Sequence, residues 1–307
     1  MPRPDPTKNS TTVRSLFSGI QAFSPGLAAE LAAVAMFRTA RRRPDRWEQD
    51  VLARAEPLRV RSAGGTLAVQ RWGKGPLVLL VHGWNGRGSQ LGAFVDPLLE
   101  AGFQVVAFDA PGHGGSTGNS SSMVQFANAF DAVVDAVKPF FQPLAGVVAH
   151  SMGGAAVTFA LSRAQANGRL EPGTRSPRLA FIAPPVDVRD FVQTVSSELG
   201  LSARTQSALE QALERRVGLR IEDLHALRLA PDMTAPLLVL HDEQDRAVPV
   251  QCGEALARAW PGAELQKTRG LGHNRILRDP SIIAAVVAHL RGRSLQVDDL
   301  RAPVAAG

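Results

Sequence analysis

The sequence predicts an α/β fold with a mostly parallel, doubly wound sheet covered by helices on both faces. Short apolar runs of strand length alternate along the chain with longer segments of helical periodicity. Such alternation favours parallel strands joined by crossover helices. A chain of 307 residues with 45% hydrophobic residues is large enough for one domain of this class with an insertion.

The candidate strands are short apolar runs bounded by turn residues. They cover residues 77–81, 103–108, 144–149, 179–183, 237–240 and 264–268. An antiparallel hairpin over residues 60–72 precedes them, with its turn at residues 63–65. Helical patterns fill the intervals at residues 90–101, 123–137, 153–167 and 253–260. The sheet body is therefore expected at residues 59–292, followed by a C-terminal tail at residues 293–307.

The alternation breaks between residues 186 and 230, where the next strand should follow directly. Apolar residues recur there at helical spacing on two faces: Phe191, Val195 and Leu199, then Leu209, Leu213 and Val217. We expect a small helical cap inserted after the sixth strand.

Residues 1–58 are expected to form an N-terminal helical extension. Ser24 precedes Pro25 as an N-cap, and Leu27, Leu31 and Val34 continue one helical face. No uncharged run is long enough for a membrane span, and no compact signal peptide is present. The extension is predicted to pack on the body or on a second subunit. Weak contact of residues 13–43 with an anionic membrane surface, or an atypical export signal, stays open.

A serine stands between an apolar strand and a helix of small residues. His150, Ser151, Met152 and Gly153 follow the strand at residues 144–149 directly. A strand that turns sharply into a helix leaves the serine at the tip, with a strained backbone and the helix N–H groups close by. Ser151 is therefore a candidate nucleophile, although a buried serine at an ordinary strand-to-helix joint is the alternative.

An acid and a histidine follow this serine in chain order. Asp245 lies in the loop after the strand at residues 237–240, and His273 lies after the strand at residues 264–268. A serine nucleophile needs a base to accept its proton and a carboxylate to orient that base. The order Ser151, Asp245, His273 fits this requirement.

These landmarks resemble the α/β-hydrolase-fold serine hydrolases, of the esterase and lipase kind with a helical cap. The resemblance covers the chain from about Leu67 to Leu290. Besides the three residues above, it rests on Val81-His82-Gly83-Trp84 and on Phe108-Asp109-Ala110-Pro111-Gly112-His113-Gly114-Gly115-Ser116. The chain departs from the pattern at Ala149 and Asp242, where relatives often have glycine. Asp242 is therefore an alternative to Asp245 as the acid. Because some relatives place the acid after the sixth strand, Asp187 is a second alternative.

The resemblance implies a role for each site residue. Ser151 would attack, His273 would act as base and Asp245 would orient it. The backbone N–H groups of Met152 and Trp84 would form the oxyanion hole. Four further residues would support the site: His82, Gly83, His150 and Gly153.

The predicted function is cofactor-independent hydrolysis of a carboxylic ester or thioester through an acyl-enzyme on Ser151. Hydrolysis of a carbon–carbon or amide bond by the same residues stays open, as does a non-catalytic ligand binder of this fold. A cap roofing the pocket with apolar side chains would favour uncharged acyl groups.

Composition argues against several other functions. The net charge is +6, but the arginines outside residues 38–46 are dispersed and not interleaved with aromatic residues, so nucleic-acid binding is not expected. Cys252 is the single cysteine, and no histidine pair has ligand spacing, so no disulfide, metal or cofactor is expected. The bacterial-like composition suits a cytoplasmic enzyme acting on a small molecule, with peripheral contact at the inner membrane face and a homodimer left open.

Overall fold

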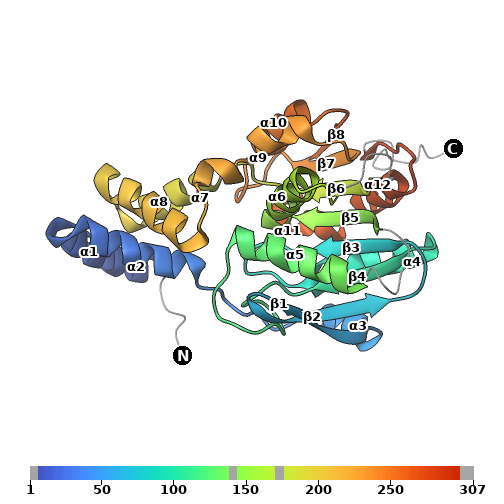
Figure 1. Cartoon of the computed structure of the whole chain (residues 1–307), viewed down its shortest axis with the longest axis horizontal. Helices are drawn as coiled ribbons and strands as arrows, with labels where there is room; N and C mark the ends of the chain where they lie inside the picture. Colours follow the sequence, from blue (N-terminus) through green and yellow to red (C-terminus); the bar gives the residue numbers. More distant parts are fainter. Residues whose placement is uncertain (1–5, 138–143, 170–175, 298–307) are drawn as a thin grey trace. The chain divides into compact units, whose positions relative to one another are not determined.

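One eight-stranded sheet forms the core of the larger part of the chain (Figure 1). The computed structural model describes residues 6–137, 144–169 and 176–297, so the outer parts of the expected extension and tail lie outside the described residues. Along the sheet the strands stand in the order β1-β2-β4-β3-β5-β6-β7-β8. Their bounds are β1 Glu56–Ser62, β2 Gly65–Trp72, β3 Leu77–Val81, β4 Gln104–Phe108, β5 Leu144–His150, β6 Arg178–Ile182, β7 Leu237–Asp242 and β8 Glu264–Thr268.

The sheet is parallel except at one edge. β1 pairs antiparallel with β2 as a hairpin, and β2 pairs antiparallel with β4. All later neighbours pair parallel. Every residue of β3 and β4 is buried. This is expected for parallel strands whose two faces are both covered by helices. The mostly parallel sheet predicted from the alternation is confirmed.

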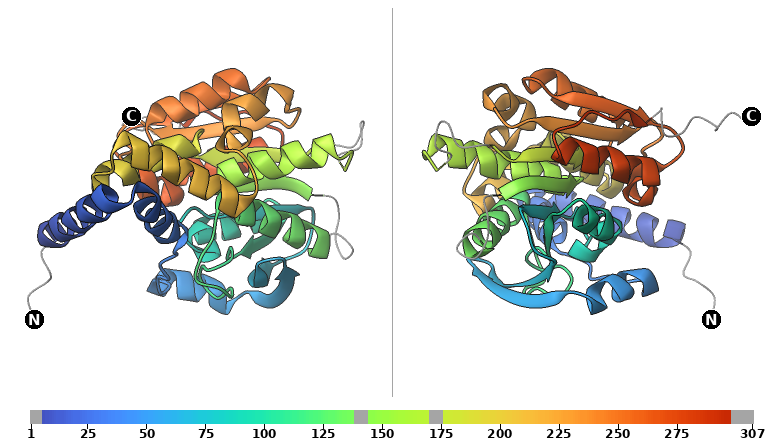
Figure 2. Two further views of the ribbon diagram at one scale, coloured as in Figure 1. Left: turned by 60° about the vertical axis from the view of Figure 1, so that its left-hand side comes forward. Right: turned by 90° about the vertical axis from the view of Figure 1, so that its right-hand side faces the viewer.

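Helices cover both faces of this sheet (Figure 2). One face packs against a 3-10 helix, η1 (Gly88–Phe94), and against α4 (Val95–Glu100) and α12 (Pro280–Leu290). The other helices that follow strands are α5 (Met123–Val137), α6 (Met152–Ala166) and α10 (Val250–Ala259). The doubly wound arrangement is thus present.

Three local predictions need correction. The helix expected at residues 90–101 begins as η1, and regular α-helix starts only at Val95, so that Pro97 lies in the first turn, where a missing N–H is tolerated. α12 was not predicted as a helix, and α3 (Arg46–Ala53) was expected only as part of the helical extension. Three strands are longer than expected, since β1 begins at Glu56, β5 ends at His150 and β7 ends at Asp242.

The chain divides into two compact units. The first, called the helical unit here, combines residues 1–38 with Asp187–His225. Its described helices are α1 (Pro6–Phe23), α2 (Pro25–Phe37), α7 (Val188–Leu199), α8 (Ala203–Val217) and the 3-10 helix η3 (Ile221–Leu224). The second, called the sheet body, comprises Thr39–Val186 and Ala226–Gly307. The chain changes unit near residue 38, so α3 belongs to the sheet body.

Small residues hold the helical unit together. Ala28, Ala29, Ala32 and Ala33 of α2 are at most 1% exposed and belong to one apolar cluster with Leu209 and Leu213 of α8. Alanine lets two helices approach closely, and two bonds from Arg215 and Arg216 to Glu30 tie the same helices at the surface. The face of α2 that the sequence pattern singles out is the exposed one, with Leu27 49%, Leu31 43% and Val34 48% exposed.

The remaining short helices belong to the sheet body. They are α9 (Ala226–Leu229), η4 (Ala230–Asp232), α11 (Gly272–Arg275) and η5 (Ile276–Arg278). In the described part of the tail, Val297 is buried and its N–H donates to the Gln266 side chain of β8 at 2.9 Å. Among the described helices, none has the length and apolarity that a bilayer span requires.

Candidate active site

Ser151 lies at the tip of the turn from β5 into α6. Its backbone has φ 51° and ψ −127°, and its N–H donates to the Ile182 carbonyl of β6 at 2.8 Å. A positive φ at a residue with a Cβ costs roughly 1–3 kcal/mol and persists only where surrounding contacts hold it. Because Met152 is the first residue of α6, its N–H has no acceptor within the helix. The serine and a backbone donor therefore share the tip of one turn.

Two glycines make room for this turn. A Cβ on Gly83 would lie 2.9 Å from the Ser151 Cβ, and one on Gly153 would lie 2.7 Å from the carbonyl oxygens of Val81 and His82. Neither position accepts a side chain without a shift of backbone. Ala149, which stands where relatives often have glycine, lies two residues before Ser151 in β5 and is completely buried.

The loop after β7 places Asp245 against His273. Asp245 Oδ2 lies 2.7 Å from His273 Nδ1, while Oδ1 accepts the N–H groups of Ala247 at 2.8 Å and Val248 at 3.0 Å. Burial raises the pKa of this carboxyl, but the bonds from His273 and the two N–H groups outweigh burial and lower it overall. The ionised carboxylate keeps the proton of His273 on Nδ1 and leaves Nε2 free to accept one.

The two alternative acids are engaged elsewhere. Asp242 is fully buried at the end of β7, where it accepts bonds from the Thr268 hydroxyl at 2.8 Å and the Leu271 N–H at 2.9 Å. Burial raises its pKa, but the donated hydrogen bonds outweigh burial and lower the pKa overall, so the carboxylate is ionised. Asp187 caps α7 in the helical unit and pairs with His225 at 3.3 Å. Of the three acids, Asp245 is the one that contacts His273.

His150 connects the serine turn to the histidine loop. Its Nε2 lies 2.9 Å from the His273 carbonyl oxygen, and the two imidazole rings are 4.6 Å apart. Burial, followed by the neighbouring His273, lowers the pKa of His150 to about 3, so the neutral ring donates from Nε2. Sequence reasoning treated His150 only as a supporting neighbour of Ser151. A contact across 123 positions of the chain leaves no local signal.

Residues 83–86 form a tight turn after β3, called the oxyanion turn here. The Gly83 carbonyl accepts the Gly86 N–H at 3.1 Å and lies 2.6 Å from His82 Nδ1. His82 Nε2 accepts the Ala110 N–H at 3.0 Å, so the ring is neutral with its proton on Nδ1. Burial is the main reason why the pKa of His82 falls to about 4. In a trans peptide the N–H points away from the carbonyl, so these bonds also fix the direction of the Trp84 N–H.

Sequence reasoning missed several groups that hold this turn. His113 Nε2 accepts the Asn85 N–H at 3.0 Å. The carboxylate of Asp109 accepts the N–H of Gly88 at 2.8 Å and that of Gly115 at 2.7 Å, which joins the loops after β3 and β4. His113 and Asp109 stand in the motif after β4, but their partners became visible only in three dimensions.

A hollow of about 1000 Å³ lies beside His273. It is lined by Glu243, Gln244, Asp245, Arg246, Ala247, Gly272, His273, Asn274 and Arg275. The Arg275 guanidinium donates to the carbonyls of Gly270 at 2.6 Å and Leu271 at 3.0 Å. The side of the site next to His273 therefore carries charged groups beside its apolar surface.

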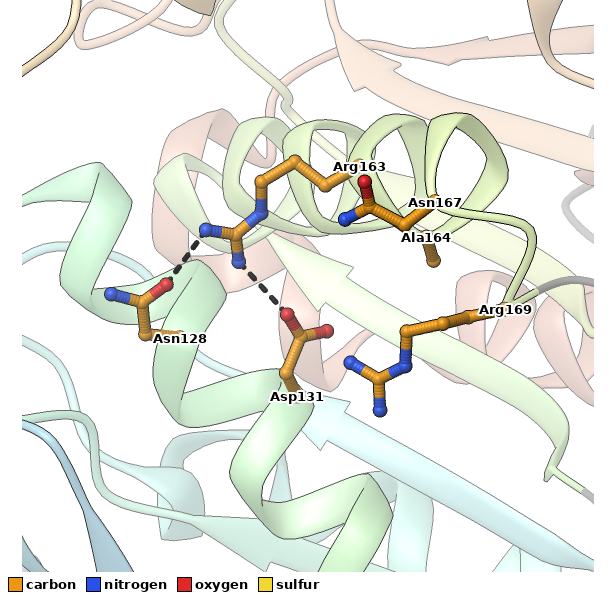
Figure 3. A pocket seen from close by; sticks show the side chains of 6 residues that line it. All are labelled: Asn128, Asp131, Arg163, Ala164, Asn167 and Arg169. Atoms are coloured by element: carbon orange, nitrogen blue, oxygen red, sulfur yellow. Dashed lines mark hydrogen bonds and ion pairs between the residues drawn. The ribbon is translucent and has the colours of Figure 1, made fainter.

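A second hollow of about 290 Å³ lies between α5 and α6 (Figure 3). Arg163 points across it and donates to Asn128 and Asp131, each at 2.8 Å. Arg169, also in its lining, pairs with Asp135. Its arginines are thus held by neighbouring side chains, and the hollow contains no nucleophile.

Within the described ranges, no group of three histidine, cysteine, aspartate or glutamate side chains is arranged to hold an ion. Cys252 is buried at the start of α10.

The fold, the serine turn and the Asp245–His273 pair define the class of protein. The sequence profile of the alpha/beta hydrolase family matches residues 78–286. The chain belongs to this family, and it is an enzyme of the α/β-hydrolase fold.

Individual relatives agree with this assignment. The chain is 28% identical over 227 residues to a pimeloyl-[acyl-carrier protein] methyl ester esterase from Vibrio atlanticus, covering 62% of this chain and 85% of the relative. It is 26% identical over 264 residues to a non-heme chloroperoxidase from Kitasatospora aureofaciens, covering 71% and 92%. The solved structure of an esterase from Pyrococcus furiosus superposes with a TM-score of 0.60 at 16% identity, covering 84% of this chain and all of that chain. At this identity the superposition speaks for the fold alone.

Proposed function

We propose that this enzyme hydrolyses a carboxylic ester or thioester through an acyl-enzyme on Ser151. The observation that carries the proposal is the 2.7 Å bond between Asp245 and His273, with His273 joined through His150 to the strained serine turn. A buried carboxylate that orients an imidazole, together with a serine at a helix N-terminus, is suited to acyl transfer. The esterase activity named for one relative agrees with this chemistry.

In the proposed reaction each group moves a proton or stabilises charge. His273 Nε2 accepts the Ser151 proton as Oγ attacks the carbonyl carbon, and the negative oxygen is stabilised by the N–H groups of Met152 and Trp84. His273 then protonates the leaving alcohol or thiol. A water molecule deprotonated by His273 attacks the acyl-enzyme and releases the acid. Asp245 stays ionised and stabilises the imidazolium in both steps.

Labelling with a fluorophosphonate tests this proposal. Such a probe phosphonylates a serine that is activated by a base, so wild-type protein should be modified on the peptide that contains Ser151. Ser151→Ala should remain unlabelled, and a serine outside the site, changed in Ser122→Ala, should not alter labelling. Folded wild-type protein that stays unlabelled would favour the non-catalytic ligand binder. If the protein is labelled and turns over a diketone or an amide but no ester, the enzyme hydrolyses a carbon–carbon or an amide bond instead.

We further propose a weak contact of the helical unit with an apolar surface. Leu16 is 60% and Phe23 89% exposed, and they stand near Leu27 and Leu31 in the sequence of α1 and α2. Two of the three arginines at residues 41–43 are already engaged within the protein, because Arg41 binds backbone carbonyls and Arg42 pairs with Asp45 and Glu48. Binding to vesicles that weakens in Phe23→Ser supports a membrane contact. A concentration-dependent dimer that this change dissociates would assign the face to a second copy. The cytoplasmic location stays a prediction.

A further inference from the structure

A short segment upstream of the family match lies against the loops of the active site. Thr39 donates its N–H to the Asn119 carbonyl at 3.1 Å and its hydroxyl to the Gly112 carbonyl at 2.8 Å. Residues 39–41 belong to the sheet body, although they precede the matched residues 78–286. We call residues 39–41 the strap.

Arg41 anchors the strap to the glycine-rich loop after β4. Its guanidinium donates to the carbonyls of Gly114 at 2.8 Å, Ser116 at 2.6 Å and Gly118 at 2.7 Å. An arginine that only faces solvent does not make three charge-assisted hydrogen bonds to one loop, so Arg41 fixes the strap to this loop. The planar guanidinium is suited to this task because its donors point in fixed directions.

The strap also holds the oxyanion turn. The Ala40 N–H donates to the Asn85 side-chain oxygen at 2.8 Å, and the Asn85 N–H donates to His113 Nε2 at 3.0 Å. Asn85 is the third residue of the turn that the bond from Gly86 to Gly83 closes, and its φ is 53°. A turn of this kind needs a positive φ at its third residue, where glycine and asparagine are favoured.

The consequence concerns the peptide that precedes Trp84. The turn fixes the Gly83 carbonyl, and the Trp84 N–H belongs to the same peptide plane. A rotation at Asn85 would open the turn and swing this N–H away from its present direction. The strap therefore acts on a group that is next to Ser151, because Gly83 approaches the serine closely.

We propose that Asn85, held by the strap through Ala40 and Arg41, is a positioning residue for the oxyanion hole. This inference rests on the proposed function, in which the Trp84 N–H stabilises the oxyanion. It makes a segment outside the family match a requirement for efficient catalysis. His113, kept neutral by burial that lowers its pKa, supplies the acceptor on the other side of Asn85.

The matched pair Asn85→Gly and Asn85→Asp tests the side-chain bond. Both replacements tolerate a positive φ, but only aspartate keeps an oxygen for the Ala40 N–H. We expect Asn85→Gly to lower kcat about tenfold or more with little change in KM, since losing an oxyanion donor outright costs about 10²–10³ in kcat. Asn85→Asp should recover most of this loss.

A second readout separates positioning from general loosening. A boronic acid forms a tetrahedral adduct on the serine, whereas the free carboxylate product does not. The ratio of their Kd values should shift about tenfold against the boronic acid in Asn85→Gly, and Arg41→Ala should shift it in the same direction. Arg43→Ala, a neighbouring exposed arginine, is the control and should match the wild type in kcat and in this ratio.

The outcomes distinguish this inference from the proposed function. Wild-type protein that neither hydrolyses esters nor binds the boronic acid overturns the proposed function, and the inference with it. An active wild type whose Asn85→Gly and Arg41→Ala variants keep the wild-type kcat and affinity ratio overturns the inference alone. If Asn85→Gly does not fold, Arg41→Ala decides by the same criterion.

Discussion

The sheet body and the helical unit use apolar residues in different ways. In the sheet body the inner strands β3 and β4 bury every side chain. In the helical unit the alanines of α2 pack against buried residues such as Leu209 and Leu213, while several other large apolar side chains remain exposed. Among the residues whose side chains are described, all exposed large apolar ones lie in the helical unit: Val13, Leu16, Phe23, Leu27, Leu31, Val34 and Phe191. The body is thus built around its own core, whereas the helical unit offers an apolar outer surface.

Polar groups differ between the units in the buried histidines. The sheet body buries histidines whose ring nitrogens bond to backbone groups, as at His82 and His150. Both units have ion pairs at their surfaces, such as Arg54 with Asp96 in the body and Glu30 with Arg215 in the helical unit. Buried hydrogen bonds with fixed partners hold a geometry, whereas surface ion pairs contribute at most about 1 kcal/mol and tolerate movement. Catalytic precision should therefore depend on the body, and the helical unit should tolerate change.

The largest expected effect comes from the nucleophile and base in the body. Ser151→Ala and His273→Ala should each lower kcat on an activated ester by about 10³-fold or more, and the double variant should cost little beyond either alone. Leu31→Ser in the helical unit is the control with nearly unchanged kcat. Steady-state kinetics and a melting curve for each variant check this. Residual activity of Ser151→Ala above a tenth of the wild type would remove Ser151 as nucleophile.

The acid gives the next largest effect. Asp245→Asn should lower kcat by about 10²–10⁴-fold because it changes the tautomer of His273 while leaving its position intact. Asp242→Asn should instead reduce stability by roughly 1–3 kcal/mol, since its carboxylate accepts several buried N–H and O–H donors. Asp187→Asn in the helical unit should leave kcat close to wild type. If Asp187→Asn or Asp242→Asn lowers kcat more than Asp245→Asn, the acid has been misassigned.

The sequence predicted the body better than the helical unit, for a physical reason. Apolar strands and the turns between them are local patterns, so β3 and β8 appear at the expected residues. The serine turn and the Asp245 loop are also local. Which segments pack against which is decided by contacts distant in the chain, such as Glu30 with Arg215 or Arg41 with the loop after β4. Neither the grouping of the N-terminal helices with the insertion nor the strap could be predicted from local patterns.

A neutral ester and its charged analogue test whether the substrate pocket is apolar or polar. We expect a neutral ester to have a kcat/KM about tenfold or more above that of its ω-carboxylate analogue, because burying an unpaired carboxylate costs several kcal/mol. Arg246 and Arg275, which line the hollow beside His273, are the two side chains that could instead pair with such a carboxylate. Equal kcat/KM values for the two esters, lost in Arg246→Gln, would show that an arginine binds the charged group and that the neutral preference is wrong.

Packing in the helical unit can be tested on adjacent residues of α2. Ala32 is 0% exposed and faces the cluster with α8, whereas Leu31 is 43% exposed. Ala32→Leu should lower the free energy of unfolding by roughly 1–3 kcal/mol through overpacking. Leu31→Ser should change it by less than about 0.5 kcal/mol. Urea unfolding measures both. A larger loss in Leu31→Ser than in Ala32→Leu would mean that the leucine face is covered in solution.

The dependence of stability on pH should come from the buried histidines of the body. The pKa of His82 is about 4, that of His289 about 4 and that of His150 about 3, each lowered first by burial. An unfolded histidine has a pKa near 6.5, so as the pH falls below about 6.5 the unfolded chain binds protons that the folded body does not.

Stability should therefore be fully present above pH 6.5 and decrease on acidification, by about 1.4 kcal/mol per pH unit for each such histidine. The decrease should continue to about pH 4 for His82 and His289. Asp242 and Asp245 add to it only at lower pH, because their pKa values lie below the usual range and their contribution is lost as the pH falls through them. His289→Gln lies outside the site, and it should make the decrease between pH 6.5 and 4 shallower. Urea unfolding at half-unit intervals measures both slopes. A wild-type stability that is flat between pH 7 and 5 would show that these rings open to water, and that the body is less rigid than its hydrogen bonds imply.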